Sequence, residues 1–264
     1  MLRKIYTTEV TSDTLPSDNP LHQRLFKAYV LALSYLNKED NVLEVGCGEG
    51  RGIDLLLPAV SHFMAVDKLK PAIDRLSDKY PQARFLAMNF PPFTGIEDNL
   101  FDVVLSFQVI EHIRDDRFFL QEIHRVLKPG GVALLTTPNR KKSLSRNPWH
   151  VREYLADELE NLTSHFFNEV EIKGIAGNDK VMAYYEQNRM AVERIMRWDV
   201  LNLQHRLPGW MLRLPYEILN RINRNRLRNR NHQLADSITH EDYLLTDRAD
   251  DALDLFVIAR KKSA

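Results

Sequence analysis

The chain has 264 residues, which suits one large domain or one domain with an insertion. Its 36 basic and 36 acidic residues cancel, so no net charge draws the protein to nucleic acid or to a membrane. One cysteine excludes a disulfide framework, and no apolar run reaches the ~20 residues of a membrane span. The polar start carries no signal-peptide pattern. We therefore expect a cytoplasmic protein without a transmembrane segment, of unknown oligomeric state.

The first predicted helix follows a polar arm. Residues 1–19 are polar and include Pro16, which indicates a loose arm or flap. Residues 21–36 carry apolar side chains at helical spacing, which predicts a helix packed on a sheet.

A strand, a glycine turn and a helix come next. Residues 42–45 are mostly apolar and predict a buried parallel strand, and residues 53–57 begin a helix. Glycines occupy positions 46, 48, 50 and 52 between them, so bare backbone N–H groups can approach a ligand such as a nucleotide. The dinucleotide pattern G-x-G-x-x-G is absent, because Arg51, Ile53 and Leu55 stand at its third glycine in the three registers. The motif is instead Glu-x-Gly-x-Gly-x-Gly, beginning at Glu44.

The second predicted strand ends in an acid. Residues 63–67 are apolar up to Asp67, about twenty residues after the glycines. A doubly wound fold places a carboxylate there to accept hydrogen bonds from ribose hydroxyls. The alternative is that Asp67 caps the helix predicted at residues 71–79.

Three further strands are predicted at residues 83–88, 101–108 and 132–137, and a helix at residues 115–127. The first of these strands ends at Asn89 and Phe90. In an open α/β sheet, ligands bind outside the carboxyl ends of the strands. Phe107 and Gln108, at the end of the second, should therefore line the binding crevice.

Four stretches together resemble the class I S-adenosylmethionine-dependent methyltransferases, in particular methyltransferase types 11 and 23 and the ubiquinone-biosynthesis O-methyltransferases. They are the glycine motif at Glu44, the acid Asp67, the dipeptide Glu111-His112 after a strand, and the run 125–131 that leads through a strand to Thr137-Pro138-Asn139. The resemblance covers residues 21–140. It implies an α/β, Rossmann-like, doubly wound sheet of seven strands, in the order 3-2-1-4-5-7-6 with the last strand antiparallel. It also implies S-adenosyl-L-methionine as the cofactor and S-adenosyl-L-homocysteine as the product.

The resemblance assigns residues to this cofactor. The glycines would admit its methionine part, and Arg24 or Tyr29 would reach its carboxylate. The alternatives are that Arg24 is solvated and that Tyr29 belongs to the core. Family members commonly carry an acid where Asn89 stands, and the amide oxygen can still accept from the adenine amino group without charge assistance. Phe90 either stacks on adenine or fills the core. The expected cofactor-binding residues are Glu44, Gly46, Cys47, Gly48, Asp67, Lys68, Asn89, Phe90, Phe107 and Gln108.

The last predicted strands lie far apart in the sequence. A helix at residues 156–164 and a strand at 166–174 are followed by a final strand only at 253–260. One domain, residues 1–264, is expected, with a core of residues 21–174 and 252–262 and a helical insertion at about 175–250. The insertion holds seven arginines and one acid between Arg206 and Arg230. It is either a solvated helical face, a lid over the acceptor, a phosphate patch, or a helix on a membrane surface.

The implied reaction is an in-line methyl transfer, for which the protein chiefly positions the acceptor and excludes water. A hydroxyl acceptor needs a base, and His112 or His150 could serve. The histidines form no metal-ligand motif, so no metal is expected. The expected acceptor is a small molecule, such as a hydroxyl of a glycan, glycolipid or quinone-like compound. The alternatives are an RNA methyltransferase that uses the arginines, although nucleic acid is not expected, and a non-catalytic cofactor-binding module.

Overall fold

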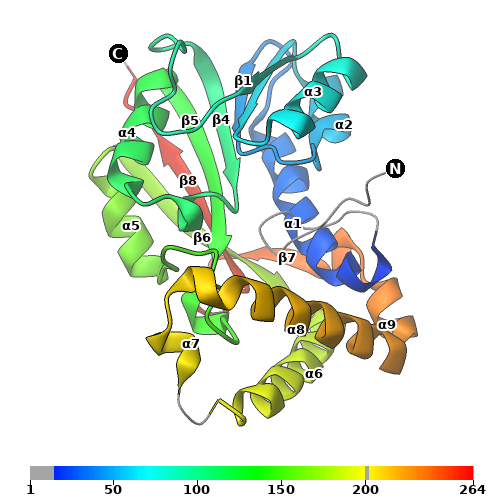
Figure 1. Ribbon diagram of the computed structural model, residues 1–264. Coiled ribbons are helices and arrows are strands. Elements are labelled where there is room, and N and C mark those ends of the chain that lie inside the picture. Colours follow the sequence, from blue (N-terminus) through cyan, green and yellow to red (C-terminus); the bar gives the residue numbers. More distant parts are fainter. Residues whose placement is uncertain (1–14, 200–201, 264) are drawn as a thin grey trace.

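The computed structural model describes residues 15–199 and 202–263 and contains one mixed sheet with helices on both faces (Figure 1). Most of the arm predicted at residues 1–19 lies outside the described residues. The sheet has eight strands in the order β3-β2-β1-β4-β5-β8-β6-β7. These strands are β1 (Asn41–Val45), β2 (His62–Asp67), β3 (Arg84–Ala87), β4 (Phe101–Phe107), β5 (Leu127–Pro138), β6 (Glu169–Gly177), β7 (Tyr243–Thr246) and β8 (Asp254–Arg260).

The central strands are parallel and buried on both faces. The pairs β1–β2, β1–β4, β2–β3 and β4–β5 are parallel, whereas β8 is antiparallel to both β5 and β6. Adjacent residues Val42 and Leu43 of β1 belong to separate apolar cores on the two faces. This explains why the strands read as continuous apolar runs. The predicted Rossmann-like α/β fold is confirmed.

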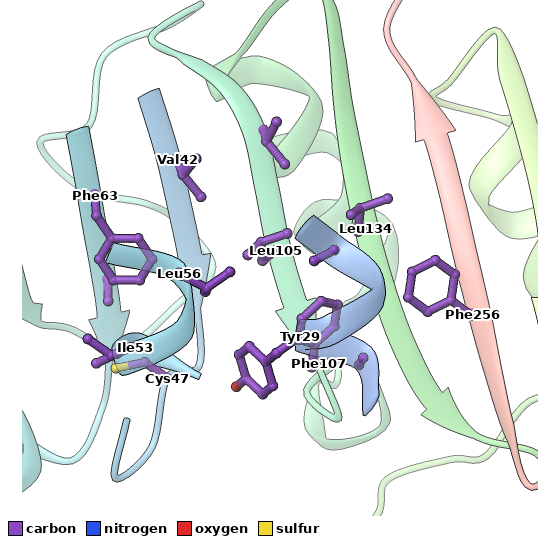
Figure 2. Close-up of a cluster of buried hydrophobic side chains, with 14 of the residues drawn as sticks. Tyr29, Val42, Cys47, Ile53, Leu56, Phe63, Leu105, Phe107, Leu134 and Phe256 are labelled. Carbon is purple, nitrogen blue, oxygen red and sulfur yellow. The ribbon is translucent and has the colours of Figure 1, made fainter. Parts of the chain in front are cut away.

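Helices cover the two faces in two groups. On one face, α1 (Asn19–Ala32), α2 (Ile53–Leu56) and α3 (Lys70–Lys79) pack on the sheet. Figure 2 shows Tyr29 beside Phe107, with Ile53 farther along the same core. On the other face lie α4 (Asp116–Val126) and α5 (Ala156–Ser164).

The start of α4 follows directly from its sequence. Asp115 accepts a hydrogen bond from the Phe118 N–H at 2.9 Å, which satisfies one backbone donor of the first helical turn. Phe119, Ile123 and Val126 then turn toward the sheet at helical spacing and are fully buried.

The sequence predicts seven strands, with only helices between the last two. This prediction is wrong in one respect, because the segment between them also contains a short strand. Residues 243–246 form β7, which pairs antiparallel with the end of β6 at the edge of the sheet. This strand is only four residues long and is specified by its pairing with β6, so its own sequence gives little signal. The seven predicted strands keep their predicted order within the eight.

We call residues 178–242 the lid segment, and its described residues include four α-helices between β6 and β7. They are α6 (Asp179–Met196), α7 (Leu203–Arg206), α8 (Gly209–Arg230) and α9 (His232–Ser237). Figure 1 shows α6, α7 and α8 grouped together at one end of the sheet. No helix of the described residues is both long and apolar enough to cross a membrane.

Candidate active site

The glycine turn after β1 has a backbone that other residues adopt with difficulty. Gly46, Gly48 and Gly50 have φ angles of 82°, 54° and 86°. A Cβ at Gly46 would overlap the side chain of Val109, whereas a Cβ at Gly48 would meet nothing within 4 Å. The turn is therefore packed against protein at Gly46 and faces open space at Gly48.

Asp67 lies directly beside this turn. Its Oδ2 accepts the Gly48 N–H at 2.8 Å, and its Oδ1 accepts the Leu69 N–H at 2.8 Å. The N-cap of α3 is Leu69, so the alternative that Asp67 caps this helix is wrong, although the second bond ties Asp67 to the chain that enters it. Each carboxylate oxygen keeps a further acceptor site. The glycine turn and the carboxylate form one continuous surface.

A cavity of about 290 Å³ opens above this surface, at the carboxyl ends of β1, β2 and β4. We call it the cofactor cavity. Leu25 and Tyr29 of α1 form a wall of it, as the family resemblance implies. Nine of the ten expected cofactor residues line it: Gly46, Cys47, Gly48, Asp67, Lys68, Asn89, Phe90, Phe107 and Gln108.

The tenth, Glu44, lies behind the turn and does not line the cavity. It is 1% exposed and accepts a hydrogen bond from the Tyr29 hydroxyl at 2.7 Å. Burial raises the pKa of Glu44 to about 7, and the charge of Asp67 adds to this effect while the bond from Tyr29 opposes it. The ring of Tyr29 also fills the space that a Cβ at Gly52 would occupy. Glu44 and the fourth glycine thus anchor α1 on the turn.

Of the two residues expected to reach the cofactor carboxylate, only Tyr29 borders this cavity. Arg24 instead places its Nε 3.1 Å from Asp254, a buried carboxylate. The sequence analysis missed Glu49 and Arg51, which also line the cavity. Their position inside the glycine motif was the available signal.

Cys47 is buried, and burial raises the pKa of its thiol well above the ordinary range. A reactive cysteine needs a lowered pKa, so this thiol is not a nucleophile. Cys47 instead fits the turn as a small residue between two glycines. Phe90 packs its ring 6.1 Å from those of Phe93 and Phe119, so it belongs to the core and to the cavity wall together.

The end of β4 joins the cofactor cavity to a second one. Gln108 has a φ angle of 58°, a left-handed conformation that is uncommon outside glycine. Its N–H donates to the Thr136 carbonyl at 2.9 Å, and this bond stabilises the strained residue. Gln108 and His112 line both cavities.

The second cavity, of about 270 Å³, lies between the sheet and the lid segment, and we call it the acceptor cavity. The lid contributes the apolar residues Val181 and Val192 and six polar ones, Tyr184, Tyr185, Asn188, Tyr216, Asn220 and Arg224. Polar side chains therefore form much of the wall.

His112 and His150 approach one another at this junction, with ring centroids 5.0 Å apart. The Nδ1 of His112 is 3.0 Å from the Trp149 carbonyl, which can only accept, so this nitrogen carries a proton and, in the neutral ring, Nε2 carries the lone pair. His150 binds Glu153 through Nδ1 at 2.7 Å and the Asn147 amide through Nε2 at 2.8 Å. The structure thus brings together the two candidate bases, of which His150 lines the acceptor cavity alone.

Two carboxylates lie beside these histidines. Glu111 is 1% exposed and accepts from the Thr137 hydroxyl at 3.0 Å, and burial raises its pKa to about 7. Burial opposes the ionisation of Glu153, but its hydrogen bonds from His150 and Ser143 hold its pKa below the usual value.

Glu111, His112 and His150 also place possible ligand atoms within 4.8 Å of one another. A carboxylate with two imidazoles is a donor set that divalent first-row metals accept. The sequence analysis expected no metal, because His150 is far from the other two in the chain.

Curated proteins of known family are similar in sequence to about half of this chain. Residues 43–135 match the methyltransferase domain family. A probable S-adenosylmethionine-dependent methyltransferase of Mycobacterium tuberculosis is 39% identical over 127 residues, 46% of this chain and 46% of the relative. A ubiquinone biosynthesis O-methyltransferase of Rickettsia typhi is 33% identical over 117 residues, 43% of this chain and 47% of the relative. The chain thus spans about half the length of the curated relatives it matches.

Solved structures extend the likeness of the fold to most of the chain. An S-adenosylmethionine-dependent methyltransferase of Thermotoga maritima aligns with a TM-score of 0.56 and 15% identity, over 92% of this chain and 91% of that one. The [4+2]-cyclase SpnF aligns with a TM-score of 0.55 and 17% identity, over 89% and 81%. At such identities the likeness shows the fold alone, as the different reaction of the cyclase illustrates. Residues 43–135 thus match a methyltransferase domain, and the fold around them is that of solved S-adenosylmethionine-dependent methyltransferases.

Proposed function

We propose that this protein transfers a methyl group from S-adenosylmethionine to a hydroxyl of a small molecule held in the acceptor cavity. The observation that carries the proposal is the meeting of the two cavities at Gln108 and His112. A cofactor in one and an acceptor in the other would face each other there. When bound, S-adenosylmethionine supplies an electrophilic methyl group on a sulfonium. The chain itself has to position the acceptor and exclude water.

His112 is the residue we assign as the base. Its Nε2 lone pair follows from the Nδ1 bond to Trp149, and the residue borders both cavities. A lone pair at this junction can take the proton that an attacking hydroxyl releases. His150 is bound through both nitrogens, so we assign it a positioning role in the acceptor wall.

The acceptor is proposed to be rich in hydroxyl groups. Tyrosines and asparagines of the lid line its cavity, and the buried Glu111 adds a carboxylate. Such groups bind hydroxyls as donors and acceptors without requiring a charged ligand. A glycan, glycolipid or quinone-like compound fits this chemistry. The names of the ubiquinone-biosynthesis relatives support the last of these.

Three of the seven arginines between Arg206 and Arg230 are paired within the protein, which weakens the case for an RNA acceptor. Arg221 and Arg224 each place a nitrogen 3.0 Å from the fully buried carboxylate of Asp18, and Arg228 pairs with Asp236 at 2.9 Å. These pairs hold α8 to the turn just before α1 and to α9. We accordingly propose one domain, in which residues 178–242 close the acceptor cavity over the methyltransferase core.

Calorimetric titration with S-adenosylhomocysteine tests the cofactor half of the proposal. Gly48→Val should abolish binding, because the added side chain would project into the cofactor cavity. Gly95→Val is the matched control, since Gly95 has a φ angle of 77° and open space around it but does not line the cavity. Asp67→Ala should weaken binding about tenfold or more, through lost bonds to the ribose and to the turn. Equal binding by Gly48→Val and Gly95→Val would refute the site.

Methyl transfer over a panel of hydroxyl acceptors tests the catalytic half. His112→Gln should lower kcat by roughly a hundredfold, the usual range for a lost base, with S-adenosylhomocysteine still bound. His150→Gln should act mainly on the KM of the acceptor. A chelator added to the wild type shows whether the Glu111–His112–His150 group works through a metal. Turnover by His112→Gln at the wild-type rate would exclude it as the base.

A further inference from the structure

The exposed apolar side chains of this protein gather on the lid segment. Among the described residues, eight of the eleven large apolar side chains that are exposed lie at residues 198–222. Six of them are on α8 and form what we call the α8 stripe: Trp210, Met211, Leu214, Ile218, Leu219 and Ile222. Their exposed fractions run from 42% for Ile222 to 72% for Trp210. A contiguous apolar surface of this kind marks an interaction site.

The spacing shows that the stripe is one face of the helix. Trp210, Leu214, Ile218 and Ile222 recur at every fourth position, so they follow one another along the helix surface. The opposite face is directed inward, because Tyr216 and Asn220 line the acceptor cavity and Leu227 is buried. The helix α8 therefore separates the acceptor cavity on one side from an apolar outer surface on the other.

Positive charge borders the stripe. At helical spacing, Arg213 falls on one side of it and Arg226 and Arg230 on the other, and all three are exposed. The guanidinium of Arg213 lies 4.1 Å from the ring centre of Trp149. Glu217, the one acid of α8, accepts a hydrogen bond from the Trp149 indole and so faces the protein.

We propose that the α8 stripe docks on an anionic phospholipid surface. A helix with tryptophan and aliphatic residues on one face and arginines at its borders lies at the boundary between headgroups and acyl chains. Arg226 and Arg230 can extend to the phosphates while their aliphatic stems cover apolar surface. A second copy of this chain would meet the same arginines as like charges, which favours the lipid occupant.

The docking also narrows the class of acceptor, and this part of the inference rests on the proposed function. With the stripe on the bilayer, α8 lies between the membrane and the acceptor cavity. An acceptor anchored by an acyl or prenyl chain could then place its hydroxyl-bearing head group in the cavity without leaving the bilayer. The inferred substrate class is therefore an amphiphile with a membrane anchor.

Co-sedimentation of the full chain with vesicles tests the docking. The probes are vesicles of phosphatidylcholine alone and vesicles in which about a third of the lipid is phosphatidylglycerol. A stripe variant combines Trp210→Ser, Leu214→Ser and Ile218→Ser, and a control variant combines Val151→Ser and Leu244→Ser, which are exposed apolar residues elsewhere. S-adenosylhomocysteine titration checks the fold of every variant, because no α8 residue lines the cofactor cavity.

The wild type and the control should bind the anionic vesicles, at least about tenfold more tightly than neutral ones. The stripe variant should lose at least about tenfold in affinity. Arg226→Gln with Arg230→Gln should weaken binding and reduce its dependence on salt. Equal binding by the stripe variant, or no binding by the wild type, overturns the proposal. So does light scattering that gives a dimer for the wild type and a monomer for the stripe variant, because a second copy then covers the stripe.

The same measurements separate the two proposals. Cofactor binding and methyl transfer to a soluble acceptor in the absence of vesicles report on the proposed function alone. If they fail while vesicle binding persists, the methyl-transfer proposal falls and the docking stands. If vesicle binding fails while transfer persists, only the docking is wrong.

Discussion

Replacing Glu44 by glutamine should make the stability of this protein less dependent on pH. Glu44 is 1% exposed, and its Oε2 has no hydrogen-bond partner among the described residues. Burial therefore raises its pKa from 4.5 to about 7. Glutamine has the same shape, keeps an oxygen that can accept from Tyr29, and carries no charge at any pH in this range.

The magnitude follows from the two pKa values. The folded protein keeps the Glu44 proton until about pH 7, whereas the unfolded chain releases it near pH 4.5. The stabilising contribution is thus complete below pH 4.5 and is lost as the pH rises through about 7. At ~1.4 kcal/mol for each unit of pKa, the loss is about 3 kcal/mol. Glu111, whose pKa burial also raises to about 7, adds a similar loss in the same window.

Urea denaturation from about pH 4 to about pH 8 measures the effect, because the difference between wild type and Glu44→Gln cancels every other titrating group. The wild type should lose unfolding free energy across this range, and the variant should lose about 3 kcal/mol less. Glu39→Gln, at an exposed position, controls for the removal of one negative charge. Parallel pH curves for wild type and Glu44→Gln would show that the carboxyl is not buried as described.

Two further substitutions and one labelling reaction test other parts of the structure. Asp18→Asn, at a carboxylate that two lid arginines bind, should cost about 3 kcal/mol of unfolding free energy and expose the lid to proteases. Gly52→Ala should cost about 2 kcal/mol in a thermal melt, because the new methyl group overlaps the Tyr29 ring. Cys47 should react with iodoacetamide at least about tenfold more slowly in the folded protein than in urea, since burial raises its pKa. A fast reaction in the folded state would contradict the packing of the turn.

The sequence was sufficient to predict the sheet and most of the cofactor cavity, for a physical reason. In a doubly wound fold, local signals coincide with the site: an apolar strand, a glycine turn and an acid after the next strand. Gly48 and Asp67 were found in this way, and the structure joins them by a 2.8 Å hydrogen bond. The position of Glu44 behind the turn was not predictable, because it depends on Tyr29 reaching across from α1.

The acceptor cavity and β7 could not be derived from sequence. The cavity gathers side chains from segments as far apart as Arg24 and Tyr216, and no local pattern reports such an approach. The pairing of His112 with His150 likewise depends on the loop after β5 folding back, with the Val151 N–H bonded to the Glu111 carbonyl at 2.7 Å. The strand β7 is determined by its edge position beside β6. Long-range packing supplies this information, and a single sequence does not display it.

The two ends of the lid segment meet. Gly177 pairs with Tyr243 at the close of the β6–β7 ladder, and the Asn178 N–H donates to the Asp242 carbonyl at 2.9 Å. A segment whose two ends are hydrogen-bonded to each other can lengthen, shorten or change its composition at little entropic cost to the strands that flank it. Under the proposed function, evolution could exchange the walls that select the acceptor while the glycine turn and Asp67 stay untouched. The same arrangement offers protein engineers a single cassette, residues 178–242, in which to alter substrate choice.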